Sequence, residues 1–182
     1  MGLRGRSIFG NTGQTFFVTT STVHHERVFG LNYKYNNILC DSLKFVLNEH
    51  RAKLHAYVFM PSHVHMIVTM PSGENISDFM RDFKKYTSTK VRQQLEKERR
   101  YSILERLRIN ATGKKNQVFK LWMDRFDDLV IENEDTLRVK LEYIHNNPVK
   151  SGLVEDAEEW EFSSARNYKF DDHHIIQVST DW

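Results

Sequence analysis

The chain has little of several features that would assign a protein to a class at once. Cys40 is the single cysteine among 182 residues, which excludes a disulfide within the chain and is typical of a reducing cytoplasm. The first residues, 1–6, lack the apolar core of a secretory signal, and no apolar run approaches the roughly 20 residues of a membrane span. These absences lead us to expect a cytoplasmic protein.

Neither sign of charge is in large excess. The chain has 26 Lys and Arg against 24 Asp and Glu, a formal net charge of +2, so a basic surface for nucleic acid would have to come from local clustering. The hydrophobic content of 40% is ordinary for a globular protein of this length. We expect a single domain over 1–182, with 1–14 as a flexible arm, 15–150 as the core and 151–182 as a C-terminal extension.

Hydrophobic patterning predicts four strands. Aromatic and β-branched residues predict the first over Thr15–Thr20, and the turn signal Pro61-Ser62 joins two more, Lys53–Met60 and His63–Met70. Both of these are apolar on their two faces, which indicates central strands. The fourth is predicted over Val118–Met123.

Helical spacing predicts three helices and completes the fold class. They run from about 32 to 50, from a cap at Asn75 or Ser77 to near 100, and over Asp135–Asn147. Residues 107–117 are predicted as a polar loop. The order strand, helix, two strands, helix, strand is that of the ferredoxin-like split β-α-β unit. We therefore expect an α+β fold, a ferredoxin-like antiparallel sheet with an added C-terminal helix.

His63 and His65 are the first candidate site residues. They lie two apart on a predicted strand, so both side chains point to one face, and two imidazoles so held can share one divalent metal ion. An unpaired imidazole on a central strand would be costly to bury. Hydrogen-bonded core or surface histidines are the alternative.

Tyr143 is the candidate nucleophile. It precedes Asn147 by four residues on the last predicted helix, so the two share a face. Pro148 predicts that this helix ends at Asn147, whose amide oxygen could be a third metal ligand. Lys140 could offer a cation to a phosphate. A half-buried structural tyrosine and a solvated lysine are the alternatives.

These residue types suit cleavage of single-stranded DNA through a covalent intermediate. A divalent cation polarises a phosphodiester and stabilises the leaving 3′ oxygen, while a phenol attacks phosphorus and forms a 5′-phosphotyrosine. A later 3′-OH can reverse that step without ATP. Lys84, Lys85 and Tyr86 combine cations with an aromatic ring and are candidate DNA contacts, with a solvated helix face as the alternative.

Four motifs carry a resemblance to a known family. They are Pro61-Ser62-His63-Val64-His65, Phe83-Lys84-Lys85-Tyr86, Tyr143-Ile144-His145-Asn146-Asn147-Pro148-Val149-Lys150-Ser151-Gly152-Leu153-Val154, and Trp160-Glu161-Phe162-Ser163-Ser164-Ala165. Over roughly residues 15 to 168 the chain resembles the single-tyrosine HUH transposases, above all the REP-associated tyrosine transposase (RAYT) branch.

The resemblance implies a ferredoxin-like catalytic domain that depends on Mg²⁺ or Mn²⁺ and cleaves single-stranded DNA beside a small hairpin, a REP-like palindrome. It implies Tyr143 as nucleophile, His63 and His65 as metal ligands, and Asn147 at the position of a polar third ligand. The expected function is DNA transposition and recombination. A DNA-binding protein of the same fold without cleavage activity is the alternative, and a phosphoesterase is disfavoured because its paired H-x-[ST] motifs are missing. We expect a monomer with the site built in one chain, with a homodimer as the alternative.

Overall fold

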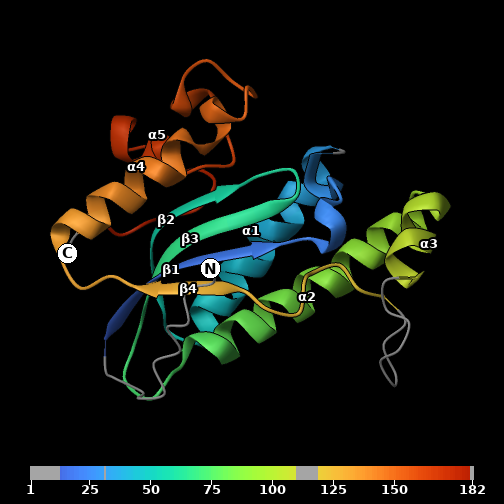
Figure 1. The fold of residues 1–182 in the computed structure, drawn as a ribbon, viewed down its shortest axis with the longest axis horizontal. Coiled ribbons are helices and arrows are strands. Elements are labelled where there is room, and N and C mark those ends of the chain that lie inside the picture. Colours follow the sequence, from blue (N-terminus) through green and yellow to red (C-terminus); the bar gives the residue numbers. More distant parts are fainter. Residues whose placement is uncertain (1–12, 31, 110–118, 181–182) are drawn as a thin grey trace.

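One antiparallel sheet forms the centre of the computed structural model, which describes residues 13–30, 32–109 and 119–180 (Figure 1). Its strand order is β2-β3-β1-β4, and the strands are β1 (Gln14–Ser21), β2 (Lys53–Phe59), β3 (His63–Met70) and β4 (Asp127–Val130). The longer helices are α1 (Tyr33–Glu49), α2 (Ile76–Lys97), α3 (Tyr101–Ile109) and α4 (Glu134–Lys150). The described elements also include the short helix α5 (Ala165–Phe170) and three 3-10 turns, Val23–His25, Val28–Gly30 and Ala157–Glu159. The expected ferredoxin-like arrangement with an added helix is confirmed.

Side chains alternate along β3, so the two faces of the sheet pack into two separate cores. Val64, Met66 and Val68 belong to the large core beneath α1 and α2, whereas Ile67 packs with Ile144 and other residues of the smaller core beneath α4. Successive side chains of a strand point to opposite faces. His63 and His65 therefore share the face that α4 covers.

The predicted first three strands and first two long helices agree with the structure, and the cap of α2 is Asn75, whose side chain accepts from the Asp78 amide. The fourth strand was placed wrongly, because β4 is Asp127–Val130 and the described residues 119–123 of the predicted range form no strand. Trp122 makes one isolated bridge, to Thr22. These apolar residues fill the core as an irregular segment.

Two helix boundaries also differ from prediction. Helix α4 continues through Pro148 to Lys150. Proline removes one N–H from the helix, but the Ser151 amide still donates to Asn147 O at 3.0 Å, so a further turn forms. Helix α3 reaches Ile109, so the predicted loop is wrong for 107–109, and 110–117 lie outside the described residues. Of the predicted flexible arm, 1–14, residues 1–12 lie outside the described residues, and Gln14 belongs to β1.

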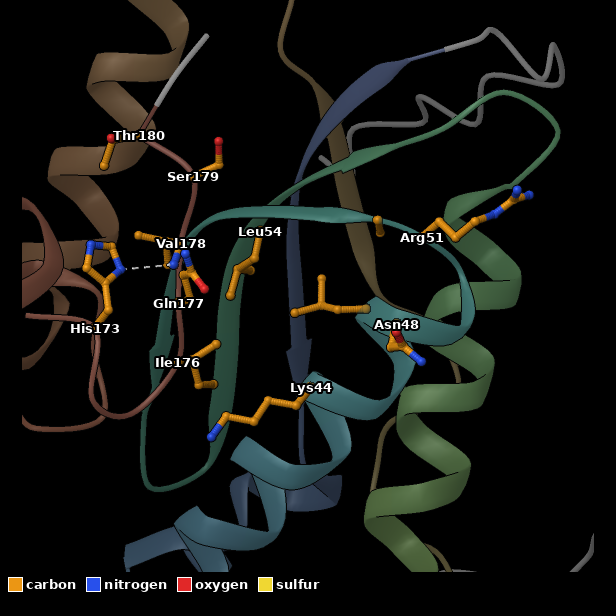
Figure 2. Close-up of a pocket in the computed structure, with 12 residues that line it drawn as sticks. Lys44, Asn48, Arg51, Leu54, His173, Ile176, Gln177, Val178, Ser179 and Thr180 are labelled. Atoms are coloured by element: carbon orange, nitrogen blue, oxygen red, sulfur yellow. Dashed lines mark hydrogen bonds between the residues drawn. The ribbon is translucent and has the colours of Figure 1, made fainter.

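β2 is an edge strand, so the prediction of two central strands is right for β3 and wrong for β2. The C-terminal segment covers the free edge of β2, and Figure 2 shows part of it, Ile176 to Thr180, close to Leu54. Three backbone bonds of 2.8–2.9 Å make this contact: Phe59 N to Phe162 O, Ser164 N to Tyr57 O, and Ser179 N to Leu54 O. A covered edge cannot pair with another chain.

In the described part of the chain, no helix combines the length and the apolarity that crossing a membrane requires.

Candidate active site

His65 is held in one orientation by a neighbouring strand. The β1–β3 register places Thr19 opposite His65, and Thr19 Oγ1 lies 2.7 Å from His65 Nδ1. The other nitrogen, Nε2, is buried and has no hydrogen-bond partner among the described residues. Burial lowers the pKa of His65 to about 3, with contributions from the nearby charges of His63 and Lys140. A neutral imidazole with one free nitrogen is the form that binds a metal ion.

His63 and Asn147 complete the predicted ligand set. The rings of His63 and His65 have centroids 4.9 Å apart, and His63 Nε2 lies 3.4 Å from Asn147 Oδ1. Asn147 is buried. Burial lowers the pKa of His63, although the contact with Asn147 opposes this shift. The structure thus brings all three predicted ligands to one place.

Tyr143 lies beside the histidines of its own chain. Its ring centroid is 5.1 Å from that of His65, edge to face at 76°, and 5.9 Å from that of Phe17. The side chain is 38% exposed, so the phenol can be reached from solvent while its ring is held by its neighbours.

Two lysines flank the tyrosine on the same helix. Lys140 Nζ lies 5.9 Å from the centre of the Tyr143 ring and 4.7 Å from that of Phe17. Lys150 Nζ lies 5.8 Å from the Tyr143 ring. The extra turn of α4 beyond Pro148 is what places Lys150 there. The site therefore has positive charge beside the Tyr143 ring.

The two imidazoles and the Asn147 amide oxygen fit a divalent metal ion that takes few of its ligands from the protein. No three or more His, Cys, Asp or Glu side chains within the described ranges are arranged to hold a metal. An ion here would bind the two imidazoles and the Asn147 amide oxygen, which leaves its other positions to water or phosphate. The unpartnered Nε2 of His65 is the observation that supports this fit.

The predicted DNA contacts on α2 lie away from this site. Lys84 donates to Met123 O at 3.0 Å and to Arg125 O at 3.1 Å, and burial lowers its pKa to about 8. Tyr86 packs against Phe45 of α1, with ring centroids 4.2 Å apart. Because α2 covers the sheet face opposite α4, Lys84, Lys85 and Tyr86 are not brought to the histidines, whereas Lys140 is.

Three residues of the site were not found from the sequence: Phe17, Thr19 and Lys150. Phe17 stacks on His65 with centroids 5.7 Å apart, and Thr19 binds the same imidazole. Both lie on β1, and their partners follow from the strand register. Lys150 was missed because the helix was expected to end earlier, although it lies seven residues after Tyr143, a spacing that returns to the same helix face.

Comparison with known proteins shows the family of the chain. The family described as "Transposase IS200 like" matches residues 18–147, from β1 to the proposed third ligand. The "REP-associated tyrosine transposase" of Escherichia coli strain K12 is 28% identical over 153 residues, which is 84% of this chain and 76% of that protein. A solved structure described as "Structure of the REP associates tyrosine transposase bound to a REP hairpin" has a TM-score of 0.66 and 25% identity, and the match covers 100% of this chain and 95% of that one. The chain belongs to the IS200-like transposase family, and both of these relatives are REP-associated tyrosine transposases.

Proposed function

We propose that this chain cuts single-stranded DNA beside a hairpin and keeps the cut end on Tyr143 as a 5′-phosphotyrosine. The observation that carries the proposal is the position of the Tyr143 ring, 5.1 Å from the His65 ring of the same chain. Membership of a transposase family supports a DNA-cutting and DNA-joining reaction. The REP hairpin bound to the solved relative supports a hairpin as the recognised DNA.

In the proposed step, the Tyr143 phenol gives up its proton to water, its oxygen bonds to phosphorus, the bond from phosphorus to the 3′ oxygen breaks, and that oxygen takes up a proton from water. Packing against Phe17 and His65 fixes the direction of the tyrosine ring. The ammonium groups of Lys140 and Lys150 stabilise negative charge on the phosphate and the phenolic oxygen. A 3′-OH that attacks the phosphotyrosine later reverses the step and joins DNA without ATP.

We further propose that His63, His65 and Asn147 hold a divalent cation, Mg²⁺ or Mn²⁺. Such an ion supplies polarisation of the scissile phosphate and stabilisation of the leaving oxygen. The protein's own part is to present neutral imidazoles: burial lowers the pKa of both histidines, and Thr19 occupies Nδ1 of His65.

A single chain carries the tyrosine and both histidines, which supports a monomer with its site in cis. Two copies that exchange catalytic helices are not required by this geometry. A cytoplasmic location is part of the same proposal, because transposition acts on DNA.

The test uses labelled single strands that contain a hairpin, incubated with the protein and Mn²⁺ and separated on a denaturing gel. We expect a slow-migrating protein–DNA band for the wild type and for Tyr101→Phe, an exposed tyrosine on α3, and no band for Tyr143→Phe. A band that survives in Tyr143→Phe would move the nucleophile elsewhere. DNA binding without any band in the wild type would favour the DNA-binding alternative.

A further inference from the structure

Two neighbouring side chains of α4 point to opposite sides of the helix. Tyr143 packs against Phe17 and His65 of the sheet. His145 follows two residues later, which turns it by about 200° around the helix axis, and its Nε2 lies 2.9 Å from Ser164 Oγ in the segment that follows α4. Rotation of α4 about its axis would therefore disturb the Tyr143 contacts and the His145 contact together.

Ser164 is fully buried and is tied to the edge strand β2. Its amide donates to Tyr57 O at 2.9 Å, and Tyr57 N donates to its Oγ at 3.0 Å. The preceding residue, Ser163, forms an isolated antiparallel bridge with Val58. The hydroxyl that His145 contacts is therefore fixed relative to the sheet.

Tyr168 of α5 also contacts the imidazole of His145. The two rings have centroids 5.2 Å apart, and Tyr168 OH donates to His55 O of β2 at 3.0 Å. Figure 1 shows α5 beside α4. Burial lowers the pKa of His145 to about 4, so the ring is uncharged at neutral pH. Its contact with Ser164 is thus a hydrogen bond between uncharged groups, and the angular preference of such a bond restricts how the ring can lie.

The sequence motif at 160–165 makes its other contacts with β2. Trp160 Nε1 donates to Phe59 O at 3.0 Å, and Phe59 N donates to Phe162 O at 2.9 Å. These contacts follow the edge of β2 and are separate from the proposed active site. Through Ser164, the same motif also reaches the helix that carries the proposed nucleophile.

We propose that His145 and Ser164 are positioning residues for the reaction of Tyr143. Their hydrogen bond joins α4 to a segment that β2 holds, and it thereby fixes the rotation of the helix that keeps the Tyr143 ring against His65. His145 acts through the helix and not on the DNA. The expected effect on cleavage rests on the proposed function, whereas the effect on the position of the Tyr143 ring does not.

The first experiment replaces Tyr143 by a fluorinated tyrosine and records the fluorine NMR spectrum without DNA or metal ion. The aromatic neighbours of this ring make the fluorine chemical shift sensitive to where the ring lies. We expect His145→Leu and Ser164→Ala to shift or split the wild-type signal. His145→Gln should keep it, because an amide can donate or accept a hydrogen bond as an imidazole nitrogen does. Ser163→Ala is the matched control and should also keep it, since this second buried serine accepts from Ala165 N instead.

The second experiment measures covalent-adduct formation on hairpin DNA with Mn²⁺, both as the rate at saturating DNA and as the DNA concentration that gives half of this rate. His145→Leu and Ser164→Ala should each lower the rate about 10- to 100-fold, since a misplacement of about 1 Å can cost about a hundredfold, and should leave the half-saturating concentration unchanged. The double variant should be no slower than either single variant, because both changes remove the same bond. His145→Gln and Ser163→Ala should react like the wild type.

Circular dichroism establishes that each variant is folded before either measurement. A wild-type fluorine signal in His145→Leu and Ser164→Ala, equal losses in His145→Gln and His145→Leu, or a shifted signal with an unchanged rate would each overturn the positioning role. Loss of the fold in both His145→Leu and Ser164→Ala would overturn it as well, because the pair would then support the whole chain. A wild type that forms no adduct defeats the proposed function, and the fluorine signals still decide whether the pair positions Tyr143.

Discussion

Thr19 Oγ1 lies 2.7 Å from His65 Nδ1 across the β1–β3 pair, and this contact decides which imidazole nitrogen stays free. With Nδ1 engaged, Nε2 is the nitrogen left buried without a partner among the described residues. A hydroxyl on one strand thus holds the ring orientation of a histidine on the next strand and leaves its Nε2 for a metal ion.

Replacing Thr19 by valine removes that hydroxyl and keeps the shape of the side chain. We expect Thr19→Val to weaken Mn²⁺ binding about 10- to 100-fold, the usual effect of losing a group that orients a metal-binding histidine. Isothermal titration calorimetry measures the affinity. The control is Thr15→Val on the same strand, whose hydroxyl contacts Thr69 Oγ1 at 2.6 Å. Equal affinities for wild type and Thr19→Val would contradict the orienting role of Thr19.

Lys150 should act on the chemical step. Its ammonium group lies 5.8 Å from the Tyr143 ring, so we expect Lys150→Gln to slow covalent-adduct formation at saturating DNA about tenfold through lost charge stabilisation. Quenched time courses on denaturing gels give the rate. Lys90→Gln, the same change at an exposed position on α2, should leave the rate as it is. A normal rate in Lys150→Gln would remove this lysine from the site.

Lys140 and Lys85 offer a comparison of two surfaces for DNA binding. Lys140 borders the proposed active site, whereas Lys85 lies on α2, on the other side of the sheet. We expect Lys140→Gln to weaken binding of the hairpin strand more than Lys85→Gln and to lower the slope of log affinity against log salt by about one. Fluorescence anisotropy at several salt concentrations measures both. A larger loss of binding affinity in Lys85→Gln would place the DNA-binding surface on α2.

His55 should make the folded chain sensitive to acid. Burial lowers its pKa below the ordinary value of 6.5, against a hydrogen bond to Ser179 O that raises it, and nearby Lys53 lowers it further. The unfolded chain therefore takes up a proton at this histidine before the folded chain does, so stability is retained above pH 6.5 and declines as the pH falls below it.

Urea midpoints measured between about pH 7 and pH 5 test this prediction. The midpoint of His55→Gln should change less across that range than the midpoint of the wild type. Parallel profiles for the two proteins would show that His55 does not contribute to the acid sensitivity.

The local sequence pattern was sufficient to predict most of the helices and strands. The apolar run of His63–Met70 after the turn signal Pro61-Ser62 and the helical spacing of Ile76–Lys97 are local patterns, so both elements could be predicted from the sequence. β4 could not: Asp127 and Asp128 open it with polar residues, and its pairing with β1 at Thr19 and Val18 is decided by tertiary structure. Leu121 and Trp122 carry the stronger strand pattern and pack into the core without forming a strand.

The site divides in the same way. His63, His65, Tyr143 and Asn147 are detectable because spacing within a strand or a helix determines which face each one shares. Phe17 and Thr19 meet His65 only through the register of β1 against β3, which no local pattern specifies.

The role of Tyr143 as the nucleophile is tested most directly by peptide mapping of the covalent adduct with tandem mass spectrometry, after nuclease digestion of the attached DNA. We expect a residual nucleotide joined through its 5′-phosphate to Tyr143. Attachment to any other side chain, or a phosphate linked through the 3′ end of the DNA, would contradict it.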